Sequence, residues 1–307
     1  MSILVFGHKN PDTDTICSAI AYAELKGKLG KDVKAVRLGE VNEETKFVLN
    51  YFKVEKPELI ESVSGKEIML VDHNERTQTA DGFEEAKVLE LVDHHRISNF
   101  NVDEPLYVRM EPVGCTATII LKLFKENNLL PSPTTAGLML SAIVSDTLLF
   151  KSPTCTGCDV KAGKELAEIA GVNVEEYGLE MLKAGTALGG KSESELINMD
   201  MKIFEVDGSK IGVAQVNTVN EAELLERKEK LLAEINNIIN KEGLKFFIFA
   251  ITNILSNDST GIVAGDGNAV IEKAFNEKID NNLIALKGVV SRKKQIIPPL
   301  TKAIQEA

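Results

Sequence analysis

Short apolar runs alternate with amphipathic helical patterns through the first part of this 307-residue chain, and this alternation constrains the fold more than any other feature. The expected strands lie at 2–6, 33–38, 67–73, 88–95 and 106–110. The expected helices lie at 15–29, 42–52, 115–126, 134–149, 159–170 and 174–184. Strands that alternate with helices form βαβ units, and these units build parallel sheets. We therefore predict an N-terminal α/β domain with a mostly parallel sheet flanked by helices.

The rest of the chain predicts a second, smaller α/β domain with a mixed sheet. Two strands are expected around the turn at Asp207 and Gly208, followed by a long charged helix at 220–241 and a strand at 245–252. A single core usually stops growing near roughly 250–300 residues, so a chain of this length favours two cores. The predicted boundaries are a first domain at 1–187, a linker at 188–195 and a second domain at 196–307.

Composition and charge exclude several classes of partner. The chain has 35 Lys and Arg against 46 Asp and Glu, a formal net charge of −11, which disfavours binding to nucleic acid. It has no Trp and only four Tyr, so platforms for base stacking are scarce. No stretch has the length of a membrane span and no signal peptide is apparent. We expect a cytoplasmic protein with neither nucleic acid nor membrane as a partner.

The "CTGC" sequence at Cys155 and Cys158 allows two interpretations. A CxxC pair can form half of a zinc site or a redox pair, or it can be two small side chains in a loop that begins a helix. No second CxxC is present, and the other two cysteines, Cys17 and Cys115, are distant in sequence. The loop is the favoured interpretation.

Three of the expected strands end in the same way, in "VFGHKNPDTD", "MLVDHN" and "ELVDHH". In a parallel α/β sheet the carboxyl ends of the strands meet at one edge, where ligands bind. The acids and histidines at these ends are His8, Asp12, Asp14, Asp72, His73, Asp93, His94 and His95, and they include all four histidines of the chain. Any one of them could instead be a helix cap or a hydrogen-bonded structural residue. Together they predict a metal site, with Asp146 in "AIVSDTLLF" as a further acid.

The number of ligands favours two metal ions over one. Several carboxylates with two or more imidazoles exceed what one ion needs, and a bridging aspartate between two ions uses the excess. Mixed oxygen and imidazole ligation suits manganese, cobalt or iron better than magnesium or calcium.

A basic run, "VVSRKKQ" at 289–295, lies in the second predicted domain. Such runs usually form a solvated surface. Here the run follows an apolar stretch that reads as a strand. Arginine binds phosphate oxygens with a planar fork and lysine supplies a point charge. Metal ions in one domain and cations in the other predict a cleft that binds a phosphorylated anion.

The motifs "GHKNPDTD", "VDHN", "DHH", "SDT" and "SRKKQ" together resemble the manganese-dependent family II inorganic pyrophosphatases of the DHH phosphoesterase superfamily. The resemblance covers essentially the whole chain. It matches the short form of the family, because no insertion is large enough for the nucleotide-binding regulatory domains that some members carry.

The resemblance implies specific roles for the site residues. One metal ion would be held by His8, Asp12 and Asp72, and the second by Asp14, Asp72, His94 and Asp146. The implied substrate-binding residues are His95, Lys202, Arg292 and Lys293, and the implied catalytic residues are His95, Asp14 and Arg292. Asp93 would orient a metal-bound histidine. His73 has no implied role, and a structural histidine is favoured there.

The resemblance also implies an activity and its cofactors. The chain would be an inorganic diphosphatase that hydrolyses pyrophosphate to two phosphates by a metal-bridging hydroxide at a di-manganese site in the interdomain cleft. It would use two Mn²⁺ per subunit, with Co²⁺ as a substitute, and Mg²⁺ would arrive with the substrate. A homodimer through the N-terminal domain is implied as well.

Two alternatives remain open. A related phosphodiesterase or exopolyphosphatase of the same superfamily is the nearer one, although no histidine follows His95, where such relatives carry a glycine-rich histidine segment. A non-catalytic metal- or nucleotide-binding regulator is the other. The complete ligand set argues against it.

Overall fold

The computed structural model describes residues 2–186, 188 and 190–306. The chain divides into two compact units, unit 1 at Met1–Gly185 and unit 2 at Thr186–Ala307. The linker predicted at 188–195 includes residue 189, which lies outside the described residues, and helix α7 (Glu193–Asn198) begins within it. No helix in the described part of the chain is both long enough and apolar enough to cross a membrane.

Unit 1 is built on a six-stranded sheet in which every pairing is parallel. Its strands are β1 (Ile3–Phe6), β2 (Val33–Arg37), β3 (Glu58–Leu59), β4 (Glu67–Val71), β5 (Lys87–Asp93) and β6 (Tyr107–Met110), in the order β3-β2-β1-β4-β5-β6. The predicted parallel sheet is confirmed. Because β1, β4 and β5 are neighbours, the three motif-bearing strand ends lie next to one another at the same edge.

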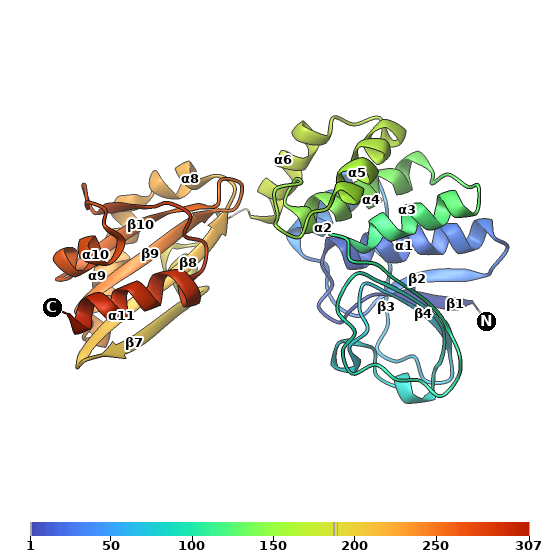
Figure 1. Cartoon of the computed structure of the whole chain (residues 1–307), viewed down its shortest axis with the longest axis horizontal. Helices are drawn as coiled ribbons and strands as arrows, with labels where there is room; N and C mark the ends of the chain where they lie inside the picture. The colour runs from blue at the N-terminus through green and yellow to red at the C-terminus, as the bar shows by residue number, and fades with distance from the viewer. Residues whose placement is uncertain (1, 187, 189, 307) are drawn as a thin grey trace. The chain divides into compact units, whose positions relative to one another are not determined.

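Helices cover one face of this sheet, as Figure 1 shows for α1, α3, α4 and α5. The helices of unit 1 are α1 (Thr13–Lys28), α2 (Glu43–Tyr51), α3 (Thr116–Glu126), α4 (Pro133–Thr147), α5 (Gly157–Ala170) and α6 (Val174–Gly185). Helix α1 begins two residues earlier than predicted, because the Asp12 carboxylate caps it by accepting a hydrogen bond from the Thr15 amide at 2.9 Å. The cap places Asp12 and Asp14 beside the end of β1.

The other face of the sheet is covered by irregular connections rather than by helices. Two short 3₁₀ turns, Arg76–Gln78 and Phe83–Glu85, lie in the connection between β4 and β5. Phe83 belongs to the same hydrophobic cluster as Phe6 of β1, and Phe100 and Val102 pack against this cluster. Both faces are therefore buried, which explains why the strands read as nearly continuous apolar runs.

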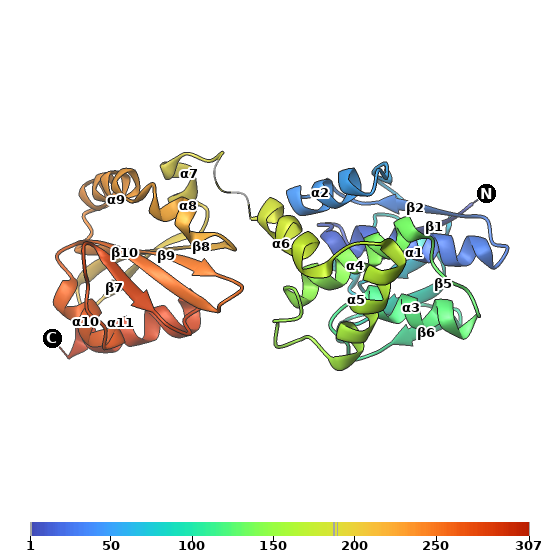
Figure 2. The same ribbon diagram turned by 90° about the horizontal axis from the view of Figure 1, so that it is seen from above.

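Unit 2 has a mixed sheet, as predicted, and it contains five strands. Its strands are β7 (Met201–Val206), β8 (Ser209–Thr218), β9 (Phe246–Asn253), β10 (Asp258–Gly265) and β11 (Leu283–Leu286), in the order β11-β10-β9-β8-β7. Strands β8 and β9 are parallel and the other pairs are antiparallel. In Figure 2 the sheet lies between α9 (Lys228–Glu242) on one side and α10 (Asn268–Phe275) with α11 (Ile297–Gln305) on the other.

The prediction of one continuous helix at 220–241 is wrong, because the structure has two helices in this range. Helix α8 (Glu221–Leu225) ends before α9 begins. The break lies at Arg227, whose guanidinium donates to the Lys191 carbonyl at 2.7 Å and forms an ion pair with Glu193 at 2.9 Å. These partners are more than 30 positions away in sequence, so helical periodicity alone could not predict the break.

The basic run also has a different local structure from the one predicted. It does not follow a strand, because β11 ends at Leu286. Instead, Arg292–Ile296 forms a π-helical turn that leads into α11. The Ser291 hydroxyl accepts a hydrogen bond from the Lys294 amide, and α11 has proline at its first positions, where the missing N–H has no intrahelical partner in any case.

Candidate metal centre

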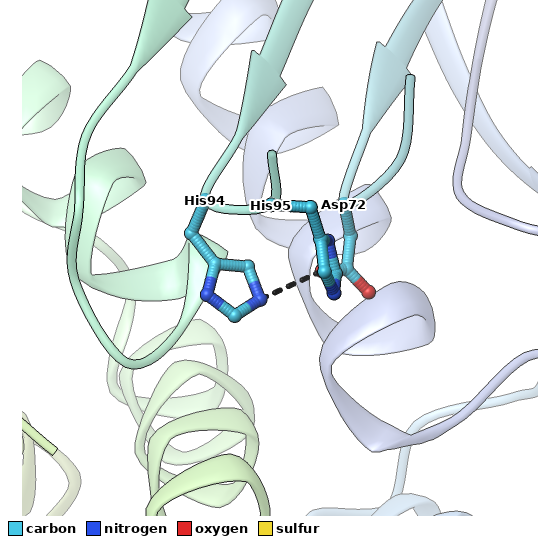
Figure 3. Close-up of side chains that lie close together, drawn as sticks. All are labelled: Asp72, His94 and His95. Atoms are coloured by element: carbon cyan, nitrogen blue, oxygen red, sulfur yellow. Dashed lines mark ion pairs between the residues drawn. The ribbon is translucent and has the colours of Figure 1, made fainter. Parts of the chain in front are cut away.

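Asp72 lies at the middle of a cluster of histidines at the carboxyl end of the unit 1 sheet. It follows β4 and is 1% exposed. His8 Nε2 is 3.6 Å from Asp72 Oδ2, and His94 Nε2 is 3.5 Å from Asp72 Oδ1. His95 Nδ1 lies 3.7 Å from the same Oδ1. Figure 3 shows Asp72 at the end of one strand, facing His94 and His95 from the adjacent strand.

Helix ends bring three further carboxylates to the cluster. At the start of α1, Asp12 Oδ2 lies 3.3 Å from His8 Nε2, and at the end of α4, Asp146 Oδ2 lies 3.7 Å from His94 Nε2. Asp14 offers an oxygen close to those of Asp146 and to the thiol of Cys115. The structure therefore gathers all six residues predicted as metal ligands, His8, Asp12, Asp14, Asp72, His94 and Asp146.

Asp72 is held rigidly by its backbone and by two hydroxyl groups. Its φ of +58° is in the left-handed region, which aspartate tolerates better than most residues. Thr15 Oγ1 donates to Asp72 Oδ2 at 2.7 Å, and Thr116 Oγ1 donates to Asp72 Oδ1 at 3.1 Å. Each carboxylate oxygen is therefore fixed in direction while it still faces a histidine.

The electrostatics of the cluster favour a cation. Burial raises the pKa of Asp72 to about 7, and the nearby Asp14 charge adds to this effect. Burial and the charges of Asp14 and Asp72 likewise raise the pKa of Asp146. Burial alone lowers the pKa of His94, but the Asp72 hydrogen bond and the Asp14 charge outweigh it and raise this pKa to about 9. The Asp14 and Asp72 charges oppose ionisation of Asp146, a repulsion that a bound cation would relieve, and the oxygen and imidazole donors fit a divalent ion such as manganese.

The two adjacent histidines are oriented by different partners. His94 Nδ1 donates to the Val113 carbonyl at 3.1 Å, which leaves Nε2 as the atom that faces Asp72 and Asp146. His95 Nδ1 donates to Asp93 at 2.9 Å. The expectation that Asp93 orients a metal-bound histidine is therefore corrected: in the structure Asp93 orients His95, and a backbone carbonyl orients His94.

His73 follows Asp72 directly and is buried. Its Nδ1 is 3.0 Å from the Val71 carbonyl, and its ring packs near Phe6. Burial lowers its pKa to about 4, so the ring is neutral at pH 7. A structural role for His73 stays a prediction.

A cavity of about 330 Å³ opens beside the cluster within unit 1. Its lining includes His8, Asn10, Asp72, His95 and Arg96. This volume holds roughly ten water molecules, which is enough for a small phosphorylated anion. Three histidines line the cavity, His8, His73 and His95.

Comparison with known proteins identifies the family of the chain. Residues 2–143 match the N-terminal domain of the DHH family, and residues 179–303 match the DHHA2 domain. A protein of Exiguobacterium sp. that bears the name manganese-dependent inorganic pyrophosphatase is 59% identical over 304 residues, covering 98% of both chains. The chain belongs to the manganese-dependent inorganic pyrophosphatase family. A Bacillus cereus protein of the same name is 55% identical over 99% of both chains.

A solved structure supports the same family. A Methanococcus jannaschii protein assigned to the family II inorganic pyrophosphatases is 44% identical, with a TM-score of 0.63, and the match covers 99% of this chain and 100% of that one. An exopolyphosphatase-related protein of Bacteroides fragilis shares the fold at 14% identity and a TM-score of 0.52. These comparisons confirm that the chain is a member of a pyrophosphatase family with a DHH-type α/β fold.

The sequence predicts three substrate-binding residues in the second domain, and all three positions fall within unit 2: Lys202, Arg292 and Lys293. Arg292 Nη1 forms an ion pair with Asp200 Oδ1 at 2.8 Å. Lys202 lies two residues after Asp200, on the outer strand β7. The side chain of Lys293 lies outside the described part of the structure. Arg292 and Lys202 thus belong to one region of unit 2.

Sequence motifs did not reveal the residue that anchors the Arg292 segment. The Gln215 side chain on β8 accepts a hydrogen bond from the Arg292 amide at 2.9 Å and donates to the Val290 carbonyl at 2.9 Å. A lone glutamine in a strand carries no recognisable signal. Only the folded chain brings it to the Arg292 segment, which is 77 positions away in sequence.

The "CTGC" sequence begins helix α5. Thr156 caps the helix and forms a reciprocal capping box with Asp159. Cys155 and Cys158 carry free thiols, and neither belongs to a potential metal-binding group among the described residues. This geometry agrees with the loop interpretation.

Proposed function

We propose that the chain hydrolyses inorganic pyrophosphate to two phosphate ions at a two-manganese centre in unit 1. The observation that carries the proposal is the position of Asp72, whose two oxygens face histidines from two different strand ends. Family membership supplies the substrate, because the relatives are named for pyrophosphate and manganese.

The proposed ligand sets divide around Asp72. Its Oδ2 faces His8, which pairs with Asp12, and these three residues would hold one ion. Its Oδ1 faces His94, which pairs with Asp146, and these residues with Asp14 would hold the second ion. Asp72 would bridge the two ions. Co²⁺ is expected to substitute for Mn²⁺ because it accepts the same donor types.

The ions would supply Lewis acidity, which lowers the pKa of a water molecule and offsets the charge of the phosphate groups. The chain itself keeps the carboxylates oriented for this role. Asp14, besides its place as a ligand, accepts hydrogen bonds from the Thr116 amide at 2.7 Å and the Ser18 hydroxyl at 2.5 Å. Its remaining lone pairs therefore point in a fixed direction, and we assign it to the catalytic set.

His95 is proposed to donate a proton to the leaving phosphate. Its hydrogen bond to Asp93 raises its pKa, an effect that burial only partly opposes. Because Nδ1 is engaged by Asp93, Nε2 is the atom available to a substrate oxygen. His95 also lines the cavity beside the cluster.

Arg292, Lys293 and Lys202 are proposed to bind the pyrophosphate oxygens, and Arg292 is the catalytic member of this group. Arginine matches two phosphate oxygens with its planar fork. To do so, the Arg292 guanidinium exchanges the Asp200 carboxylate for phosphate. Mg²⁺ is proposed to accompany the substrate and to neutralise part of its charge.

The decisive experiment measures phosphate release in the presence of Mn²⁺ from four substrates. These are pyrophosphate, tripolyphosphate, a dinucleotide and a phosphomonoester. We expect pyrophosphate to be hydrolysed far faster than the other three. Faster release from tripolyphosphate or the dinucleotide would indicate a related exopolyphosphatase or phosphodiesterase instead. No release from any substrate would indicate a non-catalytic binding protein.

A homodimer through unit 1 is also part of the proposal. Strand β6 is the outermost strand of the sheet, and its Tyr107 and Val108 are 44% and 47% exposed. An uncapped edge strand with apolar side chains is a template for pairing with another copy. Sedimentation equilibrium tests this assignment: the chain should have the mass of two subunits, and Val108→Lys should shift the mass toward one.

We further propose a cytoplasmic location. All four cysteines carry free thiols in the structure, which suits a reducing compartment. Cell fractionation with an antibody against the chain tests this location.

A further inference from the structure

Asp159 is a fully buried carboxylate outside the candidate metal centre, and four hydrogen bonds converge on it. Two come from the start of its own helix, from the Thr156 amide at 2.8 Å and the Thr156 hydroxyl at 2.6 Å. The other two come from a distant part of the chain, from the Gly114 amide at 2.9 Å and the Thr118 hydroxyl at 2.7 Å. Capping of α5 requires only the first pair. The second pair therefore needs a separate explanation.

The segment that supplies the second pair, residues 113–118, holds three of the proposed metal ligands. The Val113 carbonyl accepts the hydrogen bond of His94 Nδ1 at 3.1 Å. The Thr116 amide donates to Asp14 at 2.7 Å, and the Thr116 hydroxyl donates to Asp72 at 3.1 Å. The orientation of these ligands depends on the position of this segment.

Close packing fixes the segment against Asp159. A Cβ atom at Gly114 would lie 2.9 Å from the Asp159 carboxylate and 2.9 Å from the Thr147 side chain, so the backbone there already touches both residues. A buried carboxylate that loses its donors is costly. If the segment moved, Asp159 would lose two hydrogen-bond donors, the Gly114 amide and the Thr118 hydroxyl. If Asp159 lost its charge, the segment would lose the strength of these two hydrogen bonds.

We propose that Asp159 is a positioning residue for the metal centre. It anchors residues 113–118 to α5, so that Val113 and Thr116 hold His94, Asp14 and Asp72 in the geometry that binds manganese. This inference rests on the proposed function, because it takes those three residues as ligands. It also gives a role to the "CTGCD" sequence that the catalytic assignment leaves unused.

The test compares Mn²⁺ binding by the full-length chain and four variants, measured from the electron paramagnetic resonance signal of free Mn²⁺. Asp159→Asn removes the charge, and Thr118→Val removes one hydrogen bond on the side of the 113–118 segment. Thr156→Val removes the hydroxyl that caps α5 and leaves both hydrogen bonds from the 113–118 segment to Asp159 in place. Glu24→Gln is the matched control, because Glu24 is a carboxylate that accepts hydrogen bonds from Ser132 at the start of α4.

Asp159→Asn and Thr118→Val are expected to raise the Kd for Mn²⁺ by about tenfold, the lower end of the effect of residues that orient metal ligands. Thr156→Val and Glu24→Gln should lower the melting temperature and leave this Kd unchanged. If Asp159→Asn does not fold, the contrast between Thr118→Val and Thr156→Val decides the question. Wild-type Kd in a folded Asp159→Asn chain, or equal losses in Thr118→Val and Glu24→Gln, would overturn the inference. Failure of the wild-type chain to bind Mn²⁺ would instead overturn the proposed function.

Discussion

At the residue scale, Asp72 combines burial, backbone strain and charge at one position. It is 1% exposed, has a φ of +58° and faces three histidines. Strained backbone and buried charge persist only where the surrounding structure holds them in place, and both are frequent at functional sites. A metal ion bound by Asp72 would therefore offset part of the cost of burying its charge.

The variant Asp72→Asn tests this role. It is expected to lower both Mn²⁺ affinity and pyrophosphate hydrolysis by about 100-fold or more, because loss of a direct ligand should exceed the roughly 10- to 100-fold effect of outer partners. Equilibrium dialysis and phosphate release measure the two quantities. Asp81→Asn is the control, since Asp81 pairs with Lys9 at the surface. Normal turnover in Asp72→Asn would rule out the proposed centre.

Manganese binding is expected to depend on pH. In the metal-free chain the pKa of His94 is raised to about 9 and that of Asp72 to about 7, so at neutral pH His94 is protonated and Asp72 is about half protonated. A metal ion must displace these protons, which means that affinity rises with pH. We predict a Kd for Mn²⁺ that falls steadily from pH 6 to pH 8, with protons released into a weakly buffered solution. A Kd independent of pH over this range would contradict the proposed ligand protonation.

At the element scale, the end of α4 departs most from regular geometry. Leu148, Leu149 and Phe150 follow Asp146 closely and have φ values of +48°, +54° and +64°. Each such residue costs roughly 1–2 kcal/mol in an L-amino-acid chain. Two glycines make space for the side chains of this turn, Gly178 for Leu149 and Gly163 for Phe150. The packing against α5 and α6 therefore stabilises the turn that follows a proposed ligand.

Gly163→Ala tests this packing. The added Cβ would lie 2.6 Å from Phe150 Cζ, so the ring must move. We expect the free energy of unfolding to fall by about 1–3 kcal/mol in urea denaturation, as for other overpacked sites. Gly157→Ala in the same helix is the control, because nothing lies within 4 Å of its Cβ position. Equal stability of the two variants would show that the turn adapts freely.

At the scale of the whole molecule, the two units carry complementary chemistry. Unit 1 holds the acids and histidines of the proposed metal centre, and unit 2 holds Arg292 and Lys202. Each unit has its own sheet and its own core. Metal binding and substrate binding should therefore be separable by mutation.

Arg292→Ala is expected to separate them. Pyrophosphate hydrolysis should fall by about 100-fold, because a charge-assisted phosphate contact contributes roughly 2–3 kcal/mol. The manganese content of the purified protein should stay close to that of the wild type, since the hydrogen-bond and ion-pair partners of Arg292 in the described structure, Asp200 and Gln215, lie in unit 2. Metal analysis and phosphate release check both values. Loss of manganese in this variant would refute the assignment of the two roles to separate units.

The sequence by itself determined the parallel sheet, the mixed second sheet and the residues that gather at the strand ends. The physical reason is that apolar periodicity is local, and parallel strands carry whatever follows them to one edge of the sheet. His8, Asp72 and His94 were therefore predictable as neighbours although they are far apart in the chain.

Only the tertiary structure decided which groups hold those residues in place. Asp93 orients His95 rather than His94, Arg227 lies at the break between α8 and α9, and Asp159 accepts a hydrogen bond from the segment that contacts Asp14. Each of these assignments depends on hydrogen-bond geometry in the folded chain, and most of the partners are separated by tens of residues. No periodicity or motif encodes such pairs, because their geometry exists only once both cores have packed.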